Sequence, residues 1–219
     1  MTDHRQRQIS KILAGLKEHA TESLATYGPT AKGVGQKDER SHRLRFDKLA
    51  QVIDQPTSEE GITVNDWGCG YGAMFRYLDA LPSVRIRRYY GYDISEEMLA
   101  AAQASPAPRA EYILSPVVTQ TADYSFVAGT FNHKMESSDE LWQDYIEESL
   151  LQIASKSRRG LAFNLLSTYV DWKQEDLFYG DPFYFFDFCK RNISRYVSLL
   201  HDYPLYEWTI LIRKEEAMG

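Results

Sequence analysis

A short run of alternating glycines constrains the fold of this 219-residue chain more than any other feature. Residues 64–72 read Val-Asn-Asp-Trp-Gly-Cys-Gly-Tyr-Gly, which predicts a buried strand, a glycine turn and a helix that starts near Ala73. Because a glycine has no Cβ and can adopt a positive φ, such a turn lets bare backbone approach a ligand. The free N–H groups of the following helix can also bind that ligand. The run therefore predicts a ligand site at the end of the first strand.

Two ligand classes compete for this turn. Gly68, Gly70 and Ala73 match the dinucleotide pattern G-x-G-x-x-G/A, and Asp93 follows about twenty residues later, as that fingerprint requires. The same residues also match D-x-G-x-G-x-G, which uses Asp66, a residue that the dinucleotide pattern leaves unexplained. An acid ahead of the glycines would repel a pyrophosphate, whereas it can hold a cationic amino group. Asp66 therefore favours a ligand with a cationic amino group over a dinucleotide.

The glycine run and a second motif together carry a family resemblance. Residues 66–72, followed by Gly-Tyr-Asp-Ile-Ser at 91–95, resemble the first two motifs of class I S-adenosylmethionine-dependent methyltransferases. Either motif alone is a weak signal, whereas the ordered pair is fairly specific, and the strand–helix order extends the likeness over residues 60–215. The resemblance implies S-adenosyl-L-methionine as cofactor and methyl transfer to an O or N atom, or less readily an S atom, of a small-molecule acceptor.

The resemblance also implies where the cofactor binds. Asp93 is expected to accept both ribose hydroxyls, or alternatively to cap the next helix, and Asp66 to orient the cofactor's amino group. The sequence departs from the family where the adenine lies, because no acid directly follows the third strand; Glu111 is within it. Arg45, on a helix near the N-terminus, is expected to pair with the cofactor's carboxylate. The remaining residues expected at the cofactor are Gly68, Cys69, Gly70, Gly72, Ile94, Met98, Ser115, Pro116, Gly129 and Asn132.

Candidate catalytic residues are two histidines and a tyrosine. His133 follows the fourth strand, where the family places groups that flank the transferred methyl, and its unperturbed pKa suits a general base. His201 lies beside Asp202 and Tyr203 at the end of a later strand. The alternative for each histidine is an ordinary loop or turn residue.

Aromatic residues are dense between positions 169 and 208. Most are expected in the core, and the rest can wall a small apolar or planar pocket with tyrosine hydroxyls as polar groups. Tyr27, Tyr169 and Tyr179 are the residues expected to contact the acceptor.

Periodicity predicts an α/β fold. We expect a Rossmann-like, seven-stranded and mostly parallel sheet with helices on both faces and an antiparallel C-terminal strand pair. Residues 1–56 are expected to form an N-terminal helical lid and residues 57–219 the cofactor-binding domain. The predicted strands are 62–67, 87–92, 112–114, 124–129, 160–166, 196–201 and 205–213. The predicted helices are 6–25, 38–54, 73–81, 95–105, 137–156 and 181–192, with capping residues at Ser95 and Ser137.

Charge and composition argue against several kinds of binding partner. The net charge of −6 argues against broad nucleic-acid binding. No apolar run approaches a membrane span, the N-terminus is polar, and the two cysteines form neither a disulfide framework nor a metal cluster. These features predict a cytoplasmic protein without a metal, and a homodimer is left open. The alternatives to a methyltransferase are a nucleotide (NAD)-dependent oxidoreductase and a non-catalytic cofactor-binding member of the same fold.

Overall fold

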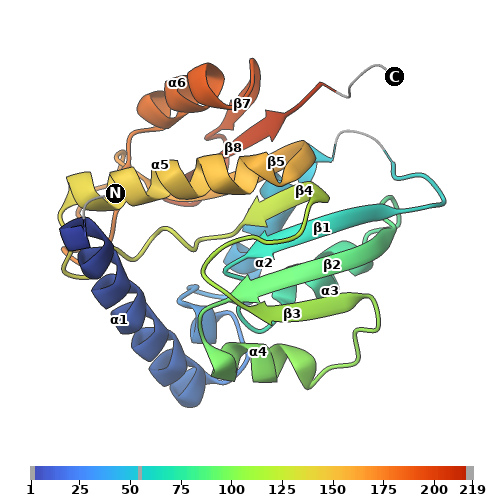
Figure 1. Cartoon of the computed structure of the whole chain (residues 1–219), viewed down its shortest axis with the longest axis horizontal. Coiled ribbons are helices and arrows are strands. Elements are labelled where there is room, and N and C mark those ends of the chain that lie inside the picture. The colour runs from blue at the N-terminus through green and yellow to red at the C-terminus, as the bar shows by residue number, and fades with distance from the viewer. Residues whose placement is uncertain (1–2, 54–55, 216–219) are drawn as a thin grey trace.

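The computed structural model describes residues 3–53 and 56–215. Seven strands form one sheet in the order β3-β2-β1-β4-β5-β8-β7, and the short strand β6 pairs with β5 (Figure 1). The strands are β1 (Ile62–Trp67), β2 (Ile86–Asp93), β3 (Ala110–Leu114), β4 (Ala122–Val127), β5 (Ser157–Ser167), β6 (Tyr179–Gly180), β7 (Tyr196–Leu200) and β8 (Glu207–Arg213). The helices are α1 (Asp3–Tyr27), α2 (Glu39–Leu49), α3 (Ala73–Asp79), α4 (Glu96–Gln103), α5 (Asp139–Ser155) and α6 (Pro182–Asn192), with short 3₁₀ turns η1 (Lys32–Val34) and η2 (Ala50–Val52).

The strand directions confirm the predicted α/β class. Strands β1 to β5 pair in parallel, whereas β8 is antiparallel to both β5 and β7. The antiparallel end follows from the short connection between β7 and β8, which cannot make a parallel crossover. The two-residue strand β6 was not predicted.

Apolar cores lie on both faces of the sheet. One face is covered by α5 and α6, which contribute buried residues such as Trp142 and Phe185. The other face is covered by α2 and α3, which contribute residues such as Phe46 and Met74. The central strands are buried on both faces of the sheet, as parallel strands usually are. Strand β1 is buried at every position. Among residues 3–53 and 56–215, no helix has both the length and the apolar character that a membrane crossing needs.

The helix starts agree with the sequence in one case and correct it in another. Ser95 caps α4 as predicted, since its hydroxyl accepts a hydrogen bond from the Met98 amide. The cap of α5 is Ser138 and not Ser137, whose hydroxyl instead donates to the Lys134 carbonyl. The second predicted helix ends at Leu49 and continues only as η2; its last predicted residue, Asp54, lies outside the described residues.

Helix α1 crosses the edge of the sheet at which the parallel strands end, from α5 to α4 (Figure 1). Near its first residues Arg5 pairs with Glu148 of α5. Further along, the Lys17 ammonium lies 2.9 Å from the Glu96 carboxylate, and the Thr21 hydroxyl donates to Glu97 of α4 at 3.1 Å. Because open α/β sheets bind ligands at this edge, α1 covers the expected ligand position.

Candidate active site

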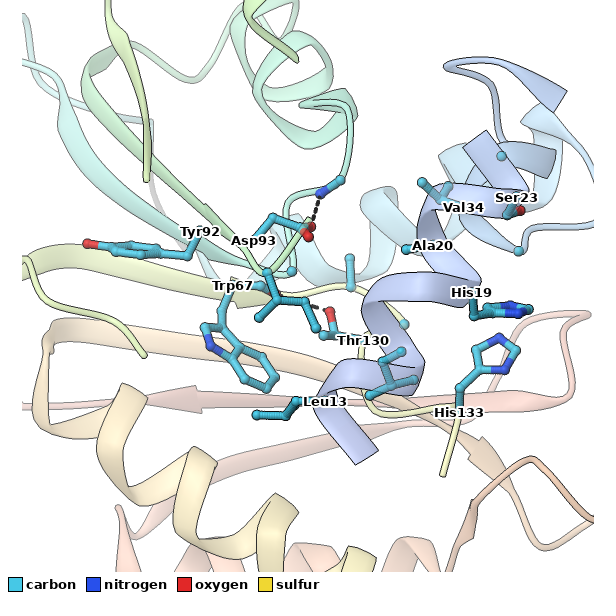
Figure 2. A pocket seen from close by; sticks show the side chains of 18 of the residues that line it. Leu13, His19, Ala20, Ser23, Val34, Trp67, Tyr92, Asp93, Thr130 and His133 are labelled. Atoms are coloured by element: carbon cyan, nitrogen blue, oxygen red, sulfur yellow. Dashed lines mark hydrogen bonds between the residues drawn. The ribbon is translucent and has the colours of Figure 1, made fainter. Parts of the chain in front are cut away.

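A cavity of about 170 Å³ lies beneath α1 at the ends of β1, β2 and β4 (Figure 2). Its floor comes from the strand ends and the loops that follow them. The lining residues from these segments include Trp67, Gly68, Gly70, Tyr92, Asp93, Ile94, Ser115, Gly129, Thr130 and His133. Its roof comes from Leu13, Leu16, His19, Ala20 and Ser23 of α1, and one side from residues 33–35.

The glycine turn is held close to two neighbouring segments. Gly68 has φ +76°, and a Cβ there would lie 2.3 Å from the Thr130 hydroxyl oxygen. Gly70 has φ +51°, and a Cβ there would lie 3.1 Å from a methyl of Val34. The positive φ favours glycine at both positions, and at Gly68 a Cβ would also clash with Thr130. The turn therefore presents bare backbone to the cavity, as the sequence predicted.

Asp93 lies half-buried at the end of β2 and faces the cavity (Figure 2). One carboxylate oxygen accepts a hydrogen bond from the Gly70 amide at 2.8 Å and the other from the Ser95 amide at 2.9 Å. Burial raises the pKa of Asp93, while these two hydrogen bonds oppose the rise. Since a carboxylate can accept about four hydrogen bonds, Asp93 keeps acceptor capacity for ligand hydroxyls.

Asp66 is buried behind the turn, against a second pocket of about 40 Å³ that His42 and Gln36 also line. One carboxylate oxygen accepts a hydrogen bond from the Tyr89 hydroxyl. The other has no hydrogen-bond partner among the described residues. Burial raises the pKa of Asp66 to about 7, against the opposing hydrogen bond from Tyr89. A buried acceptor without a partner fits a cationic donor such as the amino group of a bound ligand.

The other predicted cofactor residues line the cavity, line a neighbouring pocket or groove, or pack away from both. Ile94, Ser115 and Gly129 line the cavity, and Cys69 lines the smaller pocket. The Pro116 carbonyl accepts a hydrogen bond from the Trp67 indole at 3.0 Å, and Pro116 faces a neighbouring groove.

Met98, Gly72 and Asn132 have structural contacts instead. The Met98 sulfur lies behind Gly70, and Gly72 packs against the Tyr112 hydroxyl. The Asn132 side chain accepts from the Leu166 amide at 3.3 Å, so it holds the loop after β4 against β5.

Arg45 is engaged in a buried network. Its guanidinium pairs with Glu207 of β8, whose carboxylate also accepts from the Asn164 amide at 3.0 Å. Asn164 in turn accepts from the backbone N–H of Gly129 at 2.8 Å. The predicted pairing with a cofactor carboxylate is therefore limited to one nitrogen, Nη1, which has no hydrogen-bond partner among the described residues and faces Gly129.

Among the predicted catalytic and acceptor residues, only His133 lines the cavity. Tyr169 and His201 contact each other, with ring centroids 5.8 Å apart, and Tyr169 is 63% exposed. The Tyr203 hydroxyl bonds to Thr209. Since β5 and β8 separate β7 from β4, the residues after β7 lie along a different stretch of the edge.

The two remaining tyrosines also lie away from the lining. Tyr27 is 54% exposed at the end of α1, and the Tyr179 hydroxyl accepts from the Gln174 amide. The three tyrosines predicted to contact the acceptor therefore do not line this cavity, where Trp67, Trp142 and Tyr145 supply aromatic side chains, and their contact with an acceptor stays a prediction.

Sequence analysis missed the residues that α1 contributes. Leu13 and Leu16 belong to the apolar stripe that predicted the helix, and a stripe does not reveal whether it faces a core or a cavity. His19 lies one turn from Gly15 on the same helix side and had no local motif to mark it. Trp67 stands inside the glycine run, where its own side chain was not interpreted.

Comparison with known proteins finds methyltransferases among the relatives of this chain. The family model described as “Methyltransferase domain” matches residues 65–149. The protein “Putative methyltransferase Rv1506c” of Mycobacterium tuberculosis (strain ATCC 25618 / H37Rv) is 45% identical over 156 residues. That match covers 69% of this chain and 93% of the relative.

Three solved structures share the fold at low sequence identity. DhpI in complex with SAH has a TM-score of 0.61 and 16% identity, over 94% of this chain and 96% of that chain. Magnesium protoporphyrin IX methyltransferase (ChlM) from Synechocystis PCC 6803 with bound SAH has a TM-score of 0.60 and 15% identity, over 80% and 84%. The plantazolicin methyltransferase BpumL in complex with SAH has a TM-score of 0.55 and 16% identity, over 97% and 100%.

Proposed function

The chain belongs to the class I S-adenosylmethionine-dependent methyltransferases, and on this premise we propose that it methylates an oxygen or nitrogen atom of a small-molecule acceptor. S-adenosylmethionine is its cofactor. The observation that carries the acceptor proposal is the cavity of about 170 Å³ enclosed between the glycine turn and α1.

The residues at the cavity fit the cofactor. When bound, S-adenosylmethionine supplies a methyl group that a sulfonium activates toward nucleophiles. We propose that Asp93 accepts the ribose hydroxyls and that the unpartnered oxygen of Asp66 accepts the amino group. The backbone of Gly68 and Gly70 gives the cofactor room, and Ile94 and Ser115 contact the adenine side.

The chain's contribution to rate is then alignment and exclusion of water. Holding acceptor and methyl in line can remove on the order of 7 kcal/mol of the barrier through proximity alone. Leu13, Leu16 and Ala20 of α1 roof the cavity with apolar groups, so closure keeps the site dry. We propose that α1 is the moving part of an N-terminal lid that residues 1–56 form over the domain at 57–219.

A small acceptor suits this geometry better than a macromolecule. Helix α1 covers the cavity, and the net charge of −6 argues against a basic footprint for nucleic acid. The cavity volume of about 170 Å³ is below the range of about 300–1,000 Å³ that is typical of ligand pockets, which favours a small acceptor.

Transfer of label tests the acceptor class. The protein is incubated with S-adenosylmethionine that carries a tritiated methyl group, in parallel with a metabolite extract, total RNA, DNA and denatured protein. We expect label only in the metabolite fraction. Label in RNA, DNA or protein, with none in the metabolites, would contradict a small acceptor while leaving methyl transfer itself intact.

A further inference from the structure

Two imidazole rings face each other at the mouth of the cavity. His19 of α1 and His133 of the loop after β4 have ring centroids 4.9 Å apart (Figure 2). Both residues line the cavity, His19 exposed and His133 half-buried. Neither residue belongs to the glycine turn or to the groups that surround Asp93 and Asp66. The proposed cofactor contacts therefore leave the function of this pair open.

Helix α1 lies beside this loop. A Cβ on Gly15 would come within 3.7 Å of the terminal methyl of Met135, which is ordinary van der Waals contact, and both residues line a groove between the helix and the loop. Gly15 and His19 are four residues apart and share one helix face, which brings His19 onto His133 as Gly15 meets Met135. Met135 has φ +54°, an uncommon conformation for a residue with a side chain. Helix α1 and the loop together thus place the two imidazoles beside each other.

The electrostatic surroundings keep His133 ready to accept a proton. Its Nδ1 is buried without a hydrogen-bond partner among the described residues, and a Cβ on Gly35 in the cavity wall would lie 3.4 Å from its Nε2. The facing titratable groups are His19 and Asp176, whose carboxylate lies 3.9 Å from Nδ1; the adjacent Lys134 is 3.5 Å from Asp139. Burial, then the nearby His19, lower the pKa of His133, and Asp176 opposes them.

We propose that α1 and the loop after β4 together assemble this imidazole pair to take the proton of a hydroxyl acceptor, with His133 as the base and His19 as its positioning residue. The inference rests on the proposed function and names its acceptor class. The acceptor oxygen bonds to the methyl carbon while the carbon–sulfur bond breaks and its electron pair stays on sulfur. The hydroxyl proton passes to a nitrogen of His133 and then to water.

The chemistry selects a hydroxyl over the other acceptors. A carboxylate or thiolate needs no base, and an alkyl amine is already protonated near pH 7, so it must lose a proton before it can attack. A hydroxyl, by contrast, is neutral near pH 7, as the tyrosine value of about 10 illustrates, and sheds its proton only as it reacts. General-base catalysis is worth about 10²–10⁴-fold in such a step.

The first test needs no acceptor. The chain has five histidines, so carbon–proton NMR signals of their rings can be assigned by single substitutions and titrated. With His19→Gln the pKa of His133 is expected to rise, because the neighbouring imidazole that lowers it is lost, and with Asp176→Asn to fall. Glu18→Gln, which changes a charge on the exposed side of α1, is the matched control and leaves His133 unmoved. A His133 titration that neither variant shifts would overturn the pair.

The second test compares phenol with thiophenol, whose sulfur is ionised at pH 8. With His133→Gln, phenol methylation is expected to fall by about 10²–10⁴-fold while thiophenol methylation and S-adenosylhomocysteine binding persist. His19→Gln should move the acid limb of the phenol rate profile to higher pH. Equal loss on both probes would overturn the base role. If the wild-type protein methylates neither probe, the NMR titration alone decides whether the pair exists. If the wild-type protein does not bind S-adenosylhomocysteine, the proposed function is wrong.

Discussion

At the scale of single residues, Asp93 joins the glycine turn to the proposed position of the cofactor ribose. Replacing it with alanine removes the hydrogen-bond partner of the Gly70 amide and the proposed ribose acceptor at once. We expect cofactor affinity to fall by about 1.5–3 kcal/mol, or roughly 10- to 150-fold in Kd, as for lost hydrogen bonds to a charged group. Calorimetry with S-adenosylhomocysteine measures this. An unchanged Kd would mean that the carboxylate serves only the backbone of the turn and of α4.

Asp66 should make cofactor binding depend on pH. Its pKa of about 7 in the free protein lies above the ordinary value of 3.8, because burial penalises the charged form. The ionised form is the one that attracts a cationic amino group, so affinity for S-adenosylhomocysteine should rise from pH 6 to pH 8. Asp66→Asn should remove this rise. A pH-independent Kd in the wild-type protein would contradict the proposed role.

The raised pKa of Asp66 also makes the stability of the fold depend on pH. An acid whose pKa is raised on folding stabilises the fold most below its unfolded value, and the contribution declines as pH climbs from 3.8 towards 7. Bound cofactor should offset that decline by supplying a cation. Thermal unfolding of the wild-type and Asp66→Asn proteins, each with and without S-adenosylhomocysteine, reports both effects.

Sequence reasoning succeeded where the site is local in the chain. The glycine turn and Asp93 are set by strand–turn–helix chemistry within short segments, so residue spacing alone placed them at the cavity. It failed for Tyr169 and His201, because their distance from the cavity depends on β5 and β8 lying between β7 and β4. It also missed His19 and Glu207, whose partners are more than a hundred residues away.

At the scale of elements, α1 should control access to the cavity. A lid slows both entry and exit of ligand, so its removal speeds both while the Kd changes little. We therefore expect deletion of residues 1–28 to accelerate S-adenosylhomocysteine release in stopped-flow experiments and to abolish methyl transfer. The deletion stops before 33–35, which line the cavity themselves.

A milder variant guards against loss of folding in that experiment. Leu16→Ser keeps the helix but makes the roof of the cavity less apolar, and it should also accelerate release. Unaltered release rates in both variants, with circular dichroism showing a folded domain, would reduce α1 to a surface helix.

A buried ion pair joins α2 to β8. Arg45 and Glu207 are 7% and 2% exposed in their side chains, and Asn164 completes their network. Removing one partner leaves a buried charge, so Glu207→Leu should destabilise the fold by about 3–5 kcal/mol. The paired change Arg45→Met with Glu207→Leu should recover much of this loss.

Urea unfolding measures both variants of that pair. Asp187→Asn, which breaks an exposed pair with Arg191 within α6, is the control and should change stability little. A Glu207→Leu protein as stable as the control would show that the network does not hold α2 on the sheet.

At the scale of the whole molecule, the parallel sheet concentrates the ends of β1, β2 and β4 at one edge and α1 closes that edge. The antiparallel β7–β8 pair, which the methyltransferase resemblance predicted and an ordinary dinucleotide domain lacks, extends the sheet away from the cavity. The proposed cofactor and acceptor positions thus share the same short stretch of the molecule, beneath α1.

Calorimetry of the wild-type protein with S-adenosylhomocysteine and, separately, with NAD⁺ tests the central claim most directly. The cradle of Asp66, Gly70 and Asp93 predicts saturable micromolar binding of S-adenosylhomocysteine and no heat with NAD⁺, since Asp66 repels a pyrophosphate. Gly70→Val, which fills the space beside Val34, should abolish the first signal. Well-folded protein that gives no heat with millimolar S-adenosylhomocysteine, or that binds NAD⁺ instead, would contradict the account.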